Sequence, residues 1–420
     1  MTRTEDRLQD ALHAMAGQVR DDLLHPLSPS DQGPGSWRGW LVPAAAAASV
    51  ALVIGLVVAV TGGPRPGPGR AAAAAAPPSY YVTFRDVPDN QAVQIHATAT
   101  GQVTAEEPAP KAPSGGLVTA DALAAAPGDR TFYVEYDAFT RTARQIWIFS
   151  FTITNTGTVT PLVPVRGGVL NGQAVLDNRS SLAVSPDGAK LALTTSTTIK
   201  QASAYYSQAD KIVVIDLRTG ARTTWQGGLN RGNLYPTIQN LSWGAGGRSL
   251  VFLALWCDYP GPPKSDGLCS GASVPGGRRD AQVWSLPAGT GGGTLTGGRL
   301  LLQQSARFPV IAQALADPEG ERITTLVMSG AVTRYGMWQQ LAVDQISAAT
   351  GSLLSQPYRT VGGLGPPGTP DGVWLSSDPA GRFFLISYID GLKVAVGWIG
   401  SGTFHPLPTR LAVSAASIAW

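Results

Sequence analysis

The sequence is poor in the side chains that carry most enzyme chemistry. It has 4 histidines and 2 cysteines in 420 residues, and charged residues make up 14% of the chain. It contains no GxSxG, HExxH, phosphate-binding GxxxxGK(S/T) or EF-hand pattern. The usual motifs of serine hydrolases, zinc peptidases, nucleotide hydrolases and calcium sensors are therefore missing. An enzyme built on this chain would have to work with carboxylates, amides or hydroxyls.

The charge balance is also ordinary for this length. The net charge is +3 and the isoelectric point is near 8.9. No basic stripe with interleaved aromatic residues occurs, which is the pattern that nucleic-acid surfaces need. We therefore do not expect a nucleic-acid partner.

The two cysteines, Cys257 and Cys269, lie close together in a Gly/Pro-rich stretch. No histidine or third cysteine is beside them, so a zinc site would lack ligands. We favour a disulfide over a metal site or two free thiols. A disulfide implies an oxidising compartment.

The first 79 residues predict a membrane anchor. Within residues 1–36, Thr4–Leu24 carries apolar residues at 3–4-residue spacing, which predicts an amphipathic helix whose stripe needs a protein or membrane partner. A frayed tail is the plainer alternative. In residues 37–62, the uncharged run Leu41–Val60 is about 30 Å long as a helix and matches a bilayer core. Residues 63–79 are a Pro/Gly/Ala linker.

The alternative to an uncleaved anchor is a signal peptide, but the apolar run begins late and is long. Arginines on both sides of the span orient it only weakly. The predicted disulfide therefore decides the orientation, with residues 1–36 in the cytosol and residues 80–420 outside.

A hairpin unit recurs through residues 80–420. In Ser181–Thr194, two apolar strands flank an SPDG turn in which Pro186 presets φ and Gly188 supplies a positive φ. Similar units occur at Asp121–Val134, Leu241–Leu253, Ala314–Val327 and Trp374–Ser387. A period of about 60 residues is typical of propeller blades.

A second mark follows each hairpin, a third strand that ends in a small-residue turn. These strands are Gln94–Gly101, Ile148–Gly157, Ile212–Gly220, Ala342–Gly351 and Val394–Gly402. A fourth, more polar strand comes next. The pattern predicts an all-β, six-bladed propeller over residues 80–420. SIAW (Ser417–Trp420) matches NLSW (Asn240–Trp243), so the C-terminal strand is expected to complete the first blade, which begins at Tyr80 with its second strand.

These repeats resemble the WD-repeat and TolB-like propeller superfamily. The layout over residues 37–420 is similar to that of actinobacterial single-span membrane proteins with an extracytoplasmic propeller. The resemblance implies a fold and a topology but no catalytic residues. The chain departs from true WD blades because no repeat carries their Gly-His and Trp-Asp dipeptides. The partners of that family are therefore not transferred to it.

Two groups of residues are candidates for a site. Polar residues expected near the starts of innermost strands form a possible ring for calcium, although such residues also serve as local turn formers: Asp121, Asn178, Asn240, Gln313 and Asp371. The long insertion Cys257–Arg279 is expected on a binding face or as a tolerated loop, with the candidate contact residues Tyr259, Lys264, Arg278 and Arg279. We assign no catalytic, cofactor-binding or metal-binding residue.

The sequence thus favours a non-enzymatic, membrane-anchored propeller that binds a ligand or protein outside the cell and signals to a cytosolic partner. The alternatives are a metal-dependent hydrolase or lyase of the six-bladed type and a purely structural envelope protein. Membrane-bound regulators of sigma factors share this layout, but the Cys/His zinc motif common among them is missing here.

Overall fold

The computed structural model describes part of the chain, which its strands and turns define: residues 76–85, 91–111, 117–139, 144–171, 181–200, 206–229, 231, 236–258, 278–289, 291–329, 338–364, 373–378, 381–390, 393–400, 403–407 and 418–420. The helix predicted in residues 1–36 and the span predicted in residues 37–62 lie outside this set. Among the described residues, no helix is both long and apolar enough to cross a bilayer. Ala76–Trp420 forms one compact unit.

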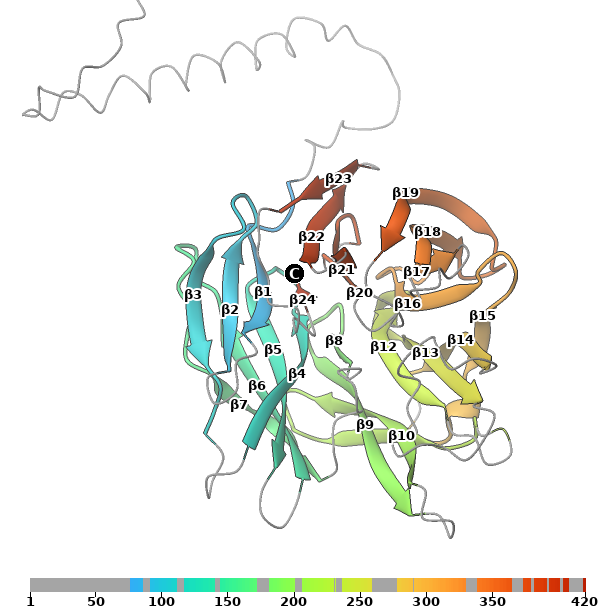
Figure 1. Cartoon of the computed structure of the whole chain (residues 1–420). Helices are drawn as coiled ribbons and strands as arrows, with labels where there is room; N and C mark the ends of the chain where they lie inside the picture. Colours follow the sequence, from blue (N-terminus) through green and yellow to red (C-terminus); the bar gives the residue numbers. More distant parts are fainter. Residues whose placement is uncertain are drawn as a thin grey trace, which may run out of the picture. The chain divides into compact units, whose positions relative to one another are not determined.

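Within this unit, six antiparallel sheets of four strands each are arranged around a common centre (Figure 1). Blades 1 to 3, from the centre outward, contain β24 (Ile418–Ala419), β1 (Tyr80–Arg85), β2 (Ala92–Ala97) and β3 (Val103–Pro108); β4 (Leu117–Ala125), β5 (Thr131–Phe139), β6 (Arg144–Thr152) and β7 (Val163–Asn171); β8 (Leu182–Val184), β9 (Lys190–Lys200), β10 (Tyr206–Asp216) and β11 (Arg222–Gln226). Each innermost strand contacts the innermost strands of both neighbouring blades, so the ring closes.

Blades 4 to 6 follow the same order. They contain β12 (Thr237–Gly244), β13 (Ser249–Asp258), β14 (Arg278–Pro287) and β15 (Arg299–Gln303); β16 (Val310–Ala316), β17 (Arg322–Ser329), β18 (Trp338–Ser347) and β19 (Leu353–Leu364); β20 (Val373–Ser377), β21 (Phe384–Asp390), β22 (Lys393–Gly400) and β23 (Thr403–Pro406). The described helices are two short 3-10 turns, η4 (Ala245–Gly247) and η5 (Leu295–Gly297). The predicted all-β, six-bladed propeller is confirmed.

The C-terminal strand closes the ring as the sequence predicted. β24 is the innermost strand of blade 1 and pairs antiparallel with β1, with Val82 opposite Ala419 and Thr83 opposite Ile418. Trp420 follows directly and is almost fully buried. Because the first and last strands share one sheet, the ring has no open edge between blades 1 and 6.

The apolar strands are explained by packing on both faces. In β13, Leu250, Phe252 and Ala254 pack toward blade 3, while Val251 and Leu253 pack toward blade 5. Each of the six interfaces between neighbouring blades holds one cluster of buried apolar side chains of this kind. A strand buried on both faces needs continuous rather than alternating hydrophobicity, which is why the inner strands read as apolar runs.

The turns between first and second strands carry the repeated glycines. Gly320 has φ +75°, and a Cβ added to it would clash with the backbone nitrogen of Ala245 in the preceding blade. Gly188, Gly247 and Gly381 also have positive φ and approach the proline of the preceding blade's turn. The glycines therefore serve both turn geometry and contact between blades.

The two faces of the propeller differ. In a four-stranded antiparallel blade, the first turn and the third turn lie on one face, and the second connection and the link to the next blade lie on the other. On the first face, called the short-turn face, the turns have two to six residues, except residues 153–162 after β6 and residues 288–298 after β14. On the opposite face β13 and β14 are separated by residues 259–277, and β19 and β20 by residues 365–372.

The polypeptide enters the propeller on the short-turn face. The carbonyl of Ser79 accepts a hydrogen bond from the backbone N–H of Thr98, in the turn after β2. The ring of Tyr80 lies beside Gly157, in the turn after β6. Residues 259–277 and 365–372 therefore join strand ends on the face opposite the start of β1.

Candidate functional site

The polar residues predicted to form a ring lie at irregular points of the innermost strands. Asp121 interrupts the register of β4 between Ala120 and Ala122. Asn240 lies within a comparable irregularity of β12, and Gln313 borders one in β16. Each is near the middle of its strand rather than at the start, where we expected it. Asn178 and Asp371 lie outside the described residues.

Gln313 links two blades. Its side-chain oxygen accepts a hydrogen bond from the backbone N–H of Leu375 in β20. Two serines do the same at neighbouring interfaces. Ser181 accepts from the N–H of Asn240 at 2.5 Å, and Ser242 accepts from the N–H of Ala316 at 2.8 Å. These side chains use their oxygens to satisfy backbone donors on the innermost strand of the next blade.

Asn240 adopts a left-handed conformation, with φ 56°. Its Oδ1 is buried and has no hydrogen-bond partner among the described residues. Asparagine tolerates this backbone conformation better than most residues. The geometry at Asn240 is thus accounted for by the bulge in β12.

Buried carboxylates gather in blades 2 and 3. Asp121 of β4 and Glu135 and Asp137 of β5 are 8%, 0% and 3% exposed. On β5 they alternate with Val134 and Tyr136, which pack against blade 1. The carboxylates therefore face blade 3. Each of the three has an interaction partner, as a buried charge requires.

In blade 3, Asp210 of β10 is buried as well, and its Oδ2 accepts the backbone N–H of Ile238 in β12 at 2.7 Å. Sequence reasoning singled out Asp121 but missed Glu135, Asp137 and Asp210. The signal was available, because acidic residues within apolar strands such as Thr131–Phe139 stand out from their neighbours.

No metal centre is formed by the described side chains. Among them, no group of three or more histidine, cysteine, aspartate or glutamate residues is placed to hold an ion. Asp121, Asn240 and Gln313, the described members of the calcium ring considered from the sequence, lie on the innermost strands of blades 2, 4 and 5.

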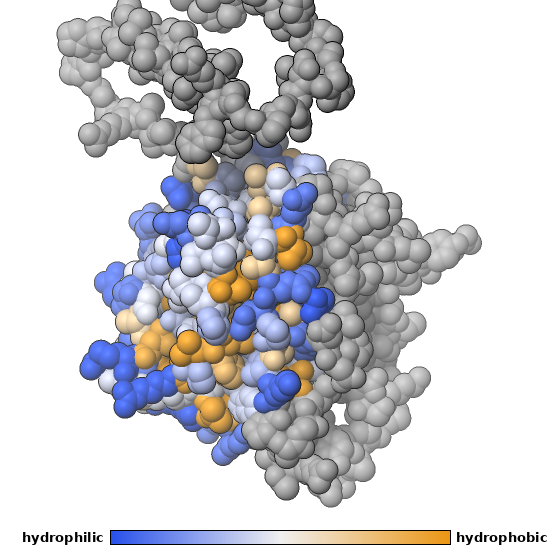
Figure 2. Space-filling model, turned by 90° about the vertical axis from the view of Figure 1, so that its left-hand side faces the viewer, coloured by the Kyte–Doolittle hydropathy of each residue, from blue (hydrophilic) through white to orange (hydrophobic). Residues whose placement is uncertain are grey.

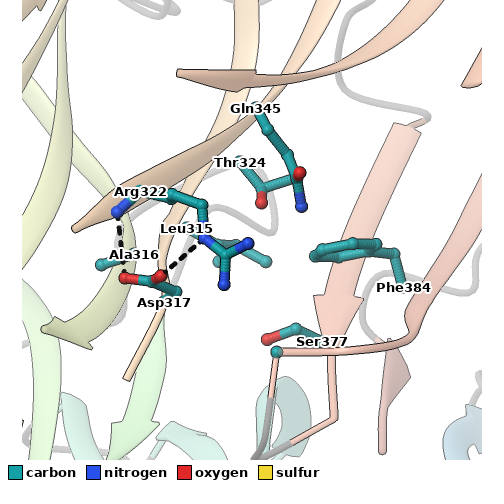
Figure 3. Close-up of a pocket in the computed structure, with 9 residues that line it drawn as sticks. Leu315, Ala316, Asp317, Arg322, Thr324, Gln345, Ser377 and Phe384 are labelled. Carbon is teal, nitrogen blue, oxygen red and sulfur yellow. Dashed lines mark hydrogen bonds and ion pairs between the residues drawn. The ribbon is translucent and has the colours of Figure 1, made fainter. Parts of the chain in front are cut away.

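A small pocket lies between blades 5 and 6 (Figure 3). Asp317 and Arg322 form an ion pair at 3.0 Å on one side, and Ser377 and Phe384 lie on the other. The enclosed space holds about one water molecule. Asp317 also accepts the backbone N–H of Arg322 at 3.1 Å, so the pair stabilises the turn after β16.

The insertion of blade 4 begins and ends on paired strands. Cys257 lies opposite Arg279, and Asp258 lies opposite Arg278. Arg278 and Arg279, expected in the loop, are therefore residues of β14, which corrects their placement. Tyr259, Lys264 and Cys269 lie outside the described residues, so the disulfide stays a prediction.

The base of this insertion is held by a charged and aromatic contact. The guanidinium of Arg231 lies 3.9 Å from the ring centre of Trp256 and 2.5 Å from Asp280. The indole N–H of Trp256 donates to the carbonyl of Leu229 at 3.0 Å. Such contacts fix where the connection between β13 and β14 leaves the propeller.

Perturbed ionisable groups are scattered rather than gathered in one cleft. Burial lowers the pKa of His96 and raises the pKa of Asp344. Burial, and then the nearby charge of Asp378, raises the pKa of Asp129. These groups belong to blades 1, 5 and 2. A catalytic site normally brings such groups together.

The outer strands expose a few apolar side chains. Figure 2 shows the face around β3 and β7, where hydrophobic patches lie among hydrophilic residues. Val103 of β3 and Val163 and Val169 of β7 are 46%, 56% and 53% exposed. Val163 and Val169 lie opposite Ser150 and Trp147 of β6, which are three residues and thus about 10 Å apart. Isolated exposed valines of this kind are common on protein surfaces.

Comparison with known proteins yields remote structural similarity. No protein-family model matches the sequence, and no curated protein matches it. The tricorn protease has a TM-score of 0.42 at 10% identity, with 80% of this chain and 30% of that chain covered. This chain thus spans less than a third of the protease.

Two further structures are similar over more of their own length. The alpha-L-arabinanase of Penicillium chrysogenum, complexed with arabinobiose, has a TM-score of 0.41 at 12% identity, covering 77% of this chain and 86% of that one. The hemagglutinin-neuraminidase of parainfluenza virus 5 has a TM-score of 0.40 at 8% identity, covering 72% and 82%. The propeller fold of this chain follows from its own sheet topology, and fold alone does not define a function.

Proposed function

We propose that this protein is a membrane-anchored binding protein whose propeller lies outside the cell and engages a ligand or protein with its long-connection face. The observation that carries the proposal is the point of entry of the polypeptide. Ser79 and Tyr80 meet the short-turn face, so the opposite face lies away from the point where the polypeptide enters the propeller.

The anchor rests on the sequence. Leu41–Val60 has no charged residue over a length that spans a bilayer core. The linker of residues 63–79 is rich in proline, glycine and alanine, and about 3 Å per residue gives it a reach of about 50 Å. The propeller would thus be held near the membrane but not against it.

The outward face carries the longest connection between described strands. Residues 259–277 connect β13 and β14, whose ends are held by the contact between Arg231, Trp256 and Asp280. Loops on a rigid scaffold are the usual carriers of binding specificity. The cytosolic end, residues 1–36, supplies an apolar stripe that an inner partner would cover.

The inner contact is tested by replacing Leu12 and Met15 with Asp in the full-length protein and recovering cross-linked partners from native membranes. The apolar stripe predicts loss of any cytosolic partner, with membrane insertion unchanged. Gln18→Asp on the polar side is the matched control and should retain the partner. If the same cytosolic protein is recovered with and without the changes at Leu12 and Met15, the inner contact is refuted and the protein is a simple tethered propeller.

The second candidate is an extracytoplasmic metal-dependent hydrolase or lyase. Its support is the burial of Asp121, Glu135 and Asp137 on adjacent strands, although these three are not placed to hold an ion together. A calcium-dependent rise in melting temperature that is lost in Asp121→Asn would support it. Identical melting in calcium and in chelator would remove this candidate while leaving the binding function untouched.

A further inference from the structure

His96 is a buried histidine in the blade that closes the ring. It lies on β2, 1% exposed, and its ring stacks on Tyr81 of β1 at 4.7 Å between centres. Its Nε2 lies 2.8 Å from the hydroxyl of Thr83, and its Nδ1 lies 3.1 Å from the carbonyl of Gly101. A carbonyl only accepts, so Nδ1 carries the hydrogen and Nε2 accepts from Thr83.

Protonation changes this arrangement. The added hydrogen on Nε2 would face the hydroxyl of Thr83, which would have to turn from donor to acceptor. The new charge would also be buried in the apolar interface between blades 1 and 6, where Tyr81 packs with Ile418 and Trp420. A buried charge is costly unless it is paired.

Thr83 connects His96 to the closing strand. In β1, Thr83 is fully buried and lies opposite Ile418 of β24. β24 comprises only Ile418 and Ala419, whereas the other innermost strands have from three residues in β8 to nine in β4. The five other innermost strands continue through a turn into the second strand of their own blade. β24 has no such covalent link to β1, and short, weakly connected elements open first.

We propose that protonation of His96 in mild acid loosens β24 and opens the ring between blades 1 and 6. Neutral His96 accepts the hydrogen bond of the Thr83 hydroxyl and so keeps Thr83 in place beside Ile418, whereas charged His96 cannot accept this hydrogen bond. The interface that opens contains Tyr81, Phe383, Leu385, Ile418 and Trp420.

The pKa of His96 supports this assignment. Burial is the main influence and lowers it below the ordinary value of 6.5, while the carbonyl of Gly101 and the charge of Glu106 act in the opposite sense. Glu106 is itself paired with Arg85 at 2.5 Å. On the side of blade 6, the described ionisable groups are Asp378 with its partner Arg382, and His405. Tyr388, Asp390 and Lys393 also belong to β21 and β22, at positions whose side chains lie outside the described residues.

The test is hydrogen exchange by mass spectrometry on the purified full-length protein in detergent, at pH 7.5 and pH 5.0, corrected for intrinsic rates. The peptide ending at Trp420 should exchange faster at pH 5.0, while peptides from β12 and β16 should not. If the open form has the ordinary histidine pKa, the acceleration has a ceiling of about 30-fold.

The chain supplies a matched pair of variants, because His96 and His405 are the two histidines of residues 76–420. His96→Gln keeps a donor and an acceptor but does not titrate, so it should abolish the acid acceleration. His405→Gln should retain it. A pH response that survives in His96→Gln would overturn the proposal. The proposal would also be overturned if hydrogen exchange in the wild-type protein accelerated equally in all blades at pH 5.0. That result does not depend on whether a variant folds.

Discussion

Two tryptophans in equivalent positions allow the closure of the ring to be tested energetically. Trp243 ends NLSW in β12 and Trp420 ends SIAW, and both are buried, at 4% and 1% exposure. The indole N–H of Trp243 donates to the carbonyl of Ala183 at 3.0 Å. The indole N–H of Trp420 is buried with no acceptor among the described residues.

Replacing each by phenylalanine removes a similar ring area but has opposite consequences for hydrogen bonding. Trp243→Phe leaves the carbonyl of Ala183 without this donor, whereas Trp420→Phe removes a donor that has no acceptor among the described residues. We expect Trp243→Phe to destabilise the propeller by about 1–3 kcal/mol more than Trp420→Phe. Replacement by alanine should cost about 3–5 kcal/mol at either position, because both side chains fill the core.

The assay is equilibrium unfolding of the purified protein in urea, followed by far-ultraviolet circular dichroism, with all four variants compared at one temperature. Equal costs for the two phenylalanine variants would show that the N–H of Trp420 is satisfied. A cost near zero for Trp420→Ala would show that β24 does not close the ring.

Two further predictions concern the turns between strands. Gly320→Ala should lower the melting temperature well below that of Gly128→Ala. Both glycines have positive φ, which costs an alanine about 1–2 kcal/mol, but only Gly320 meets backbone atoms of the preceding blade. Equal melting temperatures would refute the contact between turns. Asp129 has a raised pKa, so its ionised form weakens the fold above that pKa and the penalty disappears as the pH falls below 3.8. Asp129→Asn should therefore stabilise the protein at pH 7 but not near pH 3, whereas a gain that does not depend on pH would contradict the role of charge.

The sequence was sufficient for the architecture because the repeated marks are local. Gly188 and Gly320 mark turns that need positive φ, and the apolar runs on both sides of them are long enough to be strands buried on two faces. The match between SIAW and NLSW located the closing strand, which pairs with β1 as expected.

The candidate site was harder to predict because side-chain roles depend on contacts between blades. From the sequence, Gln313 and Asn240 could be calcium ligands or local turn formers. In the structure they lie at strand irregularities, where Gln313 accepts a neighbouring N–H. Ser181 and Ser242, which have the same role, carried no sequence signal. Glu135 and Asp137 stand out as acidic residues in an apolar strand, but that they are buried follows only from the packing on both faces of β5.

The most direct test of the central claim is the topology of the intact protein in a bacterial membrane. A reporter that is active only outside the cell is fused after Trp420 in one version of the protein and at Met1 in another. An external propeller on a single anchor predicts activity for the fusion at Trp420 and none for the fusion at Met1. The reverse pattern, or release of the first fusion into the medium by cleavage, would contradict an outward-facing propeller held by Leu41–Val60.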